Sequence, residues 1–181
     1  MKHTMALFDE APSLREQTDA GWLDNLPAPI LSIFRDYQHK LITDTAAAMR
    51  RARRILVQAP CRSGKTTVFC GMSAGASNHQ LSVLVLATRT KLVRQINERM
   101  DSMNIRHGVI AAEMPGYTLG SARVQVASVD TLYRRCIVDK KMPLPAADVV
   151  IFDEAHLALG TSRQKILDAY PNAWKFGFTA T

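Results

Sequence analysis

Residues 54–66 read RILVQAPCRSGKT, and this segment carries the strongest indication of the fold class. Its first six residues predict a short apolar strand, and the residues from Gly64 to Ser77 predict a helix. Between them lies the pattern A-x4-G-K-T, which is the phosphate-loop pattern with Ala59 in place of the first glycine. Such a loop turns its backbone N–H groups around phosphate oxygens. The alternative is an ordinary strand–helix turn that contains a capping glycine.

Each residue type in this loop has a chemical reason to be there. Gly64 allows close backbone approach, Lys65 offers a positive charge to the β- and γ-phosphates, and Thr66 offers a hydroxyl to Mg²⁺. Arg62 stands where many such loops have another glycine. It either adds a phosphate contact or points to solvent, so the geometry of the loop stays open.

The alternation of strands and helices continues through the rest of the chain. Further strands are predicted at residues 82–87, 106–111, 123–127, 149–152 and 174–178. Further helices are predicted at residues 36–51, 89–103, 129–138 and 163–170. The strands are apolar without a period of two, which is typical of parallel strands covered on both faces. We therefore expect an α/β fold with a doubly wound, mostly parallel sheet.

A second chemical signal follows the strand predicted at residues 149–152. Residues 148–156 read DVVIFDEAH, so two adjacent carboxylates come directly after an apolar strand. Ligands bind at the carboxyl ends of parallel strands, where Asp153 is placed to hold Mg²⁺ and Glu154 to polarise a water for phosphoanhydride hydrolysis. A solvated acidic turn before a helix is the alternative, and the phosphate loop upstream disfavours it.

The composition bounds the class of protein. The chain has 181 residues, 47% hydrophobic and 22% charged, which suits one globular domain and excludes wholesale disorder. The net charge is +7. Residues 1–34 have a net charge of −3 and are interpreted as an acidic extension, which leaves +10 on a domain at residues 35–181. That basic excess favours a nucleic-acid partner, with a solvated basic surface as the alternative.

Several classes of site and location are disfavoured. The apolar runs are too short to span a bilayer, and the N-terminus lacks the apolar segment of a signal peptide, so we expect a cytoplasmic protein without membrane contact. Its three cysteines show no spacing typical of a zinc site or a disulfide scaffold.

Six segments resemble, in order, the motifs of the first motor lobe of a superfamily 2 DEAD/DEAH-box-like helicase or translocase. They are FRDYQ (34–38), QAPCRSGKTT (58–67), LATRTKLVRQ (86–95), VQVASVDTLYRR (124–135), IFDEAH (151–156) and GFTAT (177–181). The resemblance implies a RecA-like P-loop lobe, ATP and Mg²⁺ as cofactors, and a nucleic acid as partner. The motifs are closer to those of DNA-repair and restriction-type translocases, so DNA is favoured over RNA.

The resemblance also implies roles for individual residues. Adenine would be read by Gln38, with Arg35 or Tyr37 beside it. The triphosphate would be held by Pro60, Arg62, Ser63, Gly64, Lys65, Thr66 and Thr67. The metal and the water would be held by Asp153 and Glu154. The nucleotide and nucleic-acid sites would be linked by His156, Thr179 and Thr181, and the nucleic-acid backbone would be faced by Thr88, Arg89, Ser128 and Thr131.

Some of these positions have simpler interpretations. Thr88 and Ser128 could be helix N-caps, Arg89 a solvated residue, and Gln38 an exposed helix residue. The chain also stops at Thr181, directly after the last motif, so the second lobe with its arginine finger is expected to be absent. Such a lobe would bind ATP and nucleic acid but hydrolyse ATP weakly. The rival functions are a small-molecule ATPase or kinase, and a non-catalytic binding module.

Overall fold

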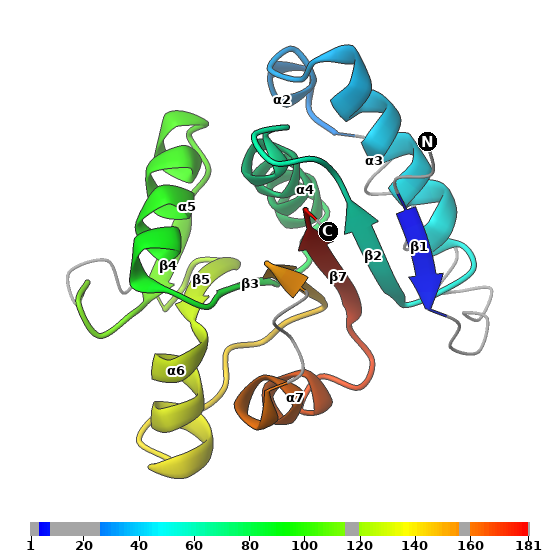
Figure 1. Cartoon of the computed structure of the whole chain (residues 1–181). Helices are drawn as coiled ribbons and strands as arrows, with labels where there is room; N and C mark the ends of the chain where they lie inside the picture. The colour runs from blue at the N-terminus through cyan, green and yellow to red at the C-terminus, as the bar shows by residue number, and fades with distance from the viewer. Residues whose placement is uncertain (1–3, 8–25, 115–119, 156–159, 181) are drawn as a thin grey trace.

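The computed structural model describes residues 4–7, 26–114, 120–155 and 160–180 (Figure 1). In this part of the chain, seven strands form one sheet in the order β1-β2-β7-β6-β3-β5-β4. Their bounds are β1 Thr4–Leu7, β2 Arg54–Gln58, β3 Val83–Ala87, β4 His107–Ile110, β5 Val124–Ser128, β6 Val149–Asp153 and β7 Trp174–Thr179. Every neighbouring pair is parallel except β1 and β2. The predicted mostly parallel α/β fold is confirmed.

Helices cover both faces of the sheet. They are α2 Ala28–Leu31, α3 Asp36–Met49, α4 Lys65–Asn78, α5 Thr90–Ser102, α6 Val129–Leu132, the π-helix η3 Tyr133–Val138, and α7 Thr161–Asp168. Figure 1 shows α3, α4 and α5 on one side of the sheet and α6 and α7 on the other. Among the described residues, no helix is long and apolar enough to cross a bilayer.

The central strand β3 explains why both faces are covered. Successive side chains on a strand point to opposite faces. Val83 and Val85 belong to the core cluster beneath α3, α4 and α5, whereas Leu84 and Leu86 belong to the cluster with α6 and α7. All four side chains are fully buried. An apolar run without alternation is therefore what a strand between two helical layers requires.

The region before residue 35 contributes two elements that the sequence pattern does not predict. β1 pairs antiparallel with β2 in the register Thr4↔Val57 to Leu7↔Arg54. Ile30 of α2 and the adjoining Phe34 are buried against α4, where a Cβ on Gly71 would lie 2.3 Å from Phe34 Cζ. The core therefore continues across the boundary expected at residue 34.

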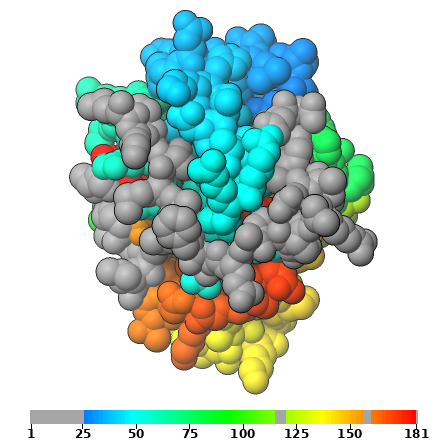
Figure 2. Space-filling model, turned by 90° about the vertical axis from the view of Figure 1, so that its right-hand side faces the viewer, coloured from blue at the N-terminus to red at the C-terminus, as the bar shows by residue number. Residues whose placement is uncertain are grey.

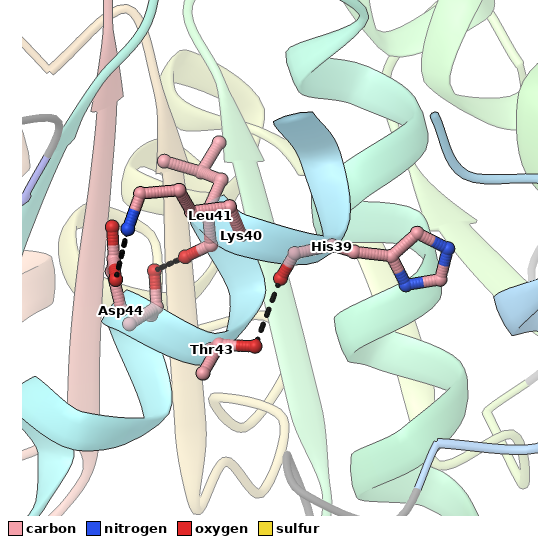
Figure 3. A network of polar contacts seen from close by, with 6 residues as sticks. His39, Lys40, Leu41, Thr43 and Asp44 are labelled. Carbon is pink, nitrogen blue, oxygen red and sulfur yellow. Dashed lines mark hydrogen bonds and ion pairs between the residues drawn. The ribbon is translucent and has the colours of Figure 1, made fainter. Parts of the chain in front are cut away.

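The exposed side of α3 is an ordinary solvated helix surface. Lys40 Nζ lies 3.2 Å from Asp44 Oδ1, and the Thr43 hydroxyl donates to the His39 carbonyl at 3.0 Å (Figure 3). Figure 2 shows α2 and α3, in blue to cyan, at the surface on one side of the molecule, with the α7 region in orange below them.

Candidate nucleotide site and nucleic-acid edge

The carboxyl ends of the parallel strands gather the predicted motifs along one edge of the sheet. β7 lies between β2 and β6, with Gln58 opposite Thr179 and Asp153 opposite Phe178. The Ala59 N–H donates to the Thr179 carbonyl at 3.0 Å, which fixes the start of the phosphate loop. The structure therefore brings together three segments that are far apart in the sequence.

The phosphate loop contains two left-handed residues. Gly64 has φ 76° and is the N-cap of α4, and Arg62 has φ 62°. A non-glycine residue in this region is strained by about 1–3 kcal/mol, which explains why glycine is common at the Arg62 position in such loops. Arg62 adopts this left-handed conformation without being a glycine, and its side chain is exposed.

Several polar groups of the loop are free to exchange their partners for an anion. Lys65 Nζ donates to the carbonyls of Ala59 and Pro60, at 3.2 and 3.3 Å. The Ser63 hydroxyl is buried and has no hydrogen-bond partner among the described residues. Thr66 is half-buried in the first turn of α4, whose N-terminal N–H groups add positive potential. These groups form a site with the chemistry of a phosphate cradle.

Gln38 of α3 makes hydrogen bonds to the phosphate loop. It is 4% exposed, its Nε2 donates to the carbonyls of Ser63 at 3.0 Å and Gly64 at 3.4 Å, and its Oε1 accepts from Arg35 N–H at 3.0 Å. The Tyr37 hydroxyl also donates to the Ser63 carbonyl, at 2.7 Å. The interpretation of Gln38 as an ordinary exposed residue is therefore wrong. Adenine reading by Gln38 and Arg35 stays a prediction.

The two carboxylates at the end of β6 are held in different environments. Asp153 is 6% exposed, and its Oδ1 accepts the Glu154 N–H at 3.0 Å. Burial raises the pKa of Asp153 above its usual value, and the Glu154 charge adds to this, while the Glu154 hydrogen bond and the Lys65 charge act against it. Glu154 is half-buried and has φ 57°, so the backbone turns sharply between the two residues. The two carboxylates therefore differ in burial and in backbone conformation.

Arg99 is a residue of this site that the sequence pattern does not single out. Its Nε and Nη2 donate to the Thr67 hydroxyl oxygen at 3.0 and 2.8 Å, which ties the end of α5 to the start of α4. Thr67 is buried. Its side chain, which was predicted to bind phosphate, makes this contact with Arg99. Beneath them, burial raises the pKa of the Cys70 thiol, while the Arg99 charge lowers it. An arginine near the end of an amphipathic helix gives no sequence signal for such a contact.

The second half of the edge carries the residues predicted to face nucleic acid. β3 and β5 are neighbours, with Ala87 opposite Ser128, so Thr88 and Arg89 lie beside Ser128. The Thr88 hydroxyl is buried with no partner among the described residues, and the N-cap of α5 is Arg89 rather than Thr88. Ser128 is the N-cap of α6 but makes no capping hydrogen bond through its side chain.

The remaining predicted residues divide into those inside and those outside the described chain. The Thr131 hydroxyl accepts the Ala112 N–H at 3.3 Å, and Thr179 is buried at the end of β7. His156 and Thr181 lie outside the described residues.

Solved structures with this fold are helicases and a restriction-modification enzyme. The UvsW helicase from bacteriophage T4 has a TM-score of 0.67 at 20% identity, over 95% of this chain and 62% of that chain. The Pyrococcus furiosus Hef helicase domain has a TM-score of 0.67 at 20% identity, over 87% of this chain and 35% of that chain. A nuclease-deletion mutant of the Type ISP restriction-modification enzyme LlaGI has a TM-score of 0.65 at 17% identity, over 82% of this chain and 17% of that chain.

These likenesses establish the RecA-like helicase fold, and the chain spans less than two thirds of each of these structures. Among curated protein sequences, none matches the chain. The family model described as "Type III restriction enzyme, res subunit" matches residues 32–181, which include the phosphate loop, both carboxylates and every parallel strand described above. The chain therefore belongs to the Type III restriction enzyme res subunit family, and it has the fold of a RecA-like helicase lobe.

Proposed function

We propose that this chain is the ATP-binding lobe of an ATP-dependent DNA helicase or translocase that hydrolyses the terminal phosphoanhydride of ATP with Mg²⁺. The observation that carries the proposal is the adjacency of β2, β7 and β6, which places Lys65, Asp153 and Glu154 on one edge. The hydrogen bond from the Ala59 N–H to the Thr179 carbonyl at 3.0 Å supports this, because it holds the start of the phosphate loop against β7, the strand next to β6.

The phosphate loop would bind the triphosphate by exchanging its internal partners. Lys65 gives up the carbonyls of Ala59 and Pro60 for oxygens of the β- and γ-phosphates, and the Ser63 hydroxyl gains its missing partner. Both exchanges replace a weak or absent contact by a charge-assisted hydrogen bond. Arg62, which is exposed, contributes at most an outer contact.

The residues fit a magnesium ion that is shared with the nucleotide. The Thr66 hydroxyl and the Asp153 carboxylate are hard oxygen donors, and burial of Asp153 makes its negative charge costly without a cation. Within the described residues there is no group of three or more His, Cys, Asp or Glu that could hold a metal alone. Magnesium usually takes one or two carboxylates together with substrate phosphates. When bound, the ion neutralises charge on the phosphate oxygens.

Glu154 is assigned to the attacking water. Its carboxylate orients the water and accepts its proton as the water oxygen bonds to the γ-phosphorus and the bond to the β-phosphate oxygen breaks, releasing ADP and phosphate. The resemblance implies that a second lobe supplies an arginine finger, worth about 10³–10⁵ in rate. The isolated lobe is therefore expected to hydrolyse ATP slowly.

The nucleic-acid strand is expected to run along the edge formed by the ends of β3 and β5. The Thr88 hydroxyl lacks a partner among the described residues, and Arg89 is exposed beside it. DNA is preferred over RNA because the family is described as a restriction enzyme subunit, and because the LlaGI structure was solved with a DNA substrate mimic.

The test measures ATP turnover with and without single-stranded DNA, on this chain and on a longer chain that carries a second lobe. Glu154→Gln should abolish turnover and keep ATP affinity, whereas Glu98→Gln on the exposed side of α5 should behave as the wild type. Parent-rate hydrolysis by Glu154→Gln would show that another group positions the water. ATP turnover without any response to DNA would favour a small-molecule ATPase, and ATP binding without turnover in the longer chain would favour a non-catalytic module.

A further inference from the structure

A basic pocket of about 410 Å³ lies beside the proposed nucleic-acid edge. It is bounded by Ala112, which follows β4, and by the α6–η3 segment together with the loop that follows it. Its charged lining consists of Arg134, Arg135, Lys141, Asp130 and Asp139. Thr131, already predicted to face nucleic acid, also lines the pocket.

The π-helix η3 gives this pocket its shape. A single helix is predicted at residues 129–138, but after Leu132 the structure changes to the wider π form. The Asp139 N–H donates to the Arg134 carbonyl at 2.8 Å, and the Lys141 N–H donates to the Arg135 carbonyl at 2.8 Å. Lys140 between them has φ 52°, in the left-handed region. π-Helical turns are rare and occur frequently at functional sites.

Two cations lie beside one carboxylate at the end of η3. Asp139 Oδ2 lies 3.3 Å from Lys141 Nζ and 3.9 Å from Arg134 Nε. The Asp139 side chain is 26% exposed, whereas those of Lys141 and Arg134 are 74% and 80% exposed. Ion pairs at such exposure contribute little to stability. The carboxylate therefore adds little to the stability of the fold, and it lies between two exposed cations.

We propose that this pocket binds one phosphodiester group of a nucleic-acid strand, and that Asp139 competes with that phosphate for Lys141 and Arg134. The inference rests on the nucleic-acid partner of the proposed function and extends the strand path from Ser128 and Thr131 along η3. Bound phosphate takes over both cations, and the displaced Asp139 carboxylate turns to water. Asp139 thereby weakens binding and keeps contact with the strand reversible.

The test is fluorescence anisotropy with a labelled single-stranded oligothymidylate at several salt concentrations. Asp139→Asn should tighten binding about fourfold at low salt, the effect of removing one unit charge about 5 Å from a phosphate in water. Arg134→Ala and Lys141→Ala should each weaken binding and reduce the slope of log K against log salt by about 0.7.

Asp44→Asn is the matched control. This substitution also removes one carboxylate charge from an ion pair, because Asp44 Oδ1 lies 3.2 Å from Lys40 Nζ one helical turn away (Figure 3). The Asp44 side chain is 34% exposed, similar to that of Asp139, and Asp44 does not line the pocket. Its affinity should stay close to that of the wild type. Equal changes for Asp139→Asn and Asp44→Asn, or unchanged salt slopes for Arg134→Ala and Lys141→Ala, would overturn the inference alone. Absence of binding by the wild type at low salt would overturn the nucleic-acid part of the proposed function as well.

Discussion

Gly64→Ala tests the contact between the phosphate loop and α3. Gly64 has φ 76°, and a Cβ built there would lie 2.5 Å from Gln38 Nε2. The new methyl group therefore meets two obstacles, a left-handed backbone that alanine adopts reluctantly and an amide group that must move. Moving Gln38 breaks its hydrogen bonds to the Ser63 carbonyl and to Arg35 N–H.

The expected cost is the sum of these two effects. An L-residue in the left-handed region costs about 1–2 kcal/mol. Loss of the Gln38 hydrogen bonds adds about 0.5–1.5 kcal/mol for each bond. We therefore expect Gly64→Ala to lower the free energy of unfolding by about 2–5 kcal/mol in urea denaturation followed by circular dichroism.

A double-mutant cycle with Gln38→Ala separates the two effects. In that background the clash is gone, so Gly64→Ala should cost only the backbone part, about 1–2 kcal/mol. Gly120→Ala is the control, because a Cβ there meets no described atom within 4 Å, and its effect should stay within about 0.5 kcal/mol. An equal cost of Gly64→Ala in both backgrounds, within about 0.5 kcal/mol, would refute the contact.

The remaining predictions concern the three charges around the site. Lys65→Ala should weaken Mg-ATP binding by about tenfold or more, because it removes the charge that faces the phosphates; equal affinities by calorimetry would remove the phosphate-loop assignment. Arg99→Lys keeps the charge but loses the two hydrogen bonds to the Thr67 hydroxyl. We expect it to lower the free energy of unfolding by about 1 kcal/mol and the melting temperature by about 2–4 °C. Arg94→Lys, on the exposed side of α5, should melt at the wild-type temperature. Burial raises the pKa of Asp153, so the folded chain binds this proton more readily than the unfolded chain, and stability falls as pH rises through the raised pKa. Nucleotide-free Asp153→Asn should therefore unfold at a higher temperature than the wild type at pH 7, and the difference should shrink as pH falls toward the usual aspartate value of about 3.9. A lower melting temperature of this variant at pH 7 would contradict that account.

Local sequence was sufficient for the elements of the parallel sheet. The apolar runs of β2, β3, β5, β6 and β7 are each found within about two residues of their expected bounds. Their order in the sheet came only with the structure, because strand neighbours are chosen by contacts between residues that are far apart in the chain. The predicted meeting of the phosphate loop and Asp153 followed from a general rule, that the carboxyl ends of parallel strands share one edge.

The elements that the sequence pattern does not predict are those whose stability comes from contacts with neighbouring elements. β1 has four residues and no distinctive pattern, and its hydrogen bonds depend on the free edge of β2. The change from α6 to η3 also escapes a pattern search, because residues 129–138 retain the apolar spacing of a single helix.

The local sequence was enough to predict the chemistry of the site: a lysine and hydroxyl side chains in a strand–loop–helix unit, and two carboxylates directly after an apolar strand. These signals are local, since each depends on residue types at a fixed spacing. The folded structure was needed to show that Gln38 donates to the carbonyls of Ser63 and Gly64, and that Arg99 donates to Thr67 across 32 residues of sequence. Such contacts are set by the packing of α3, α4 and α5 against one face of the sheet, which no local pattern records.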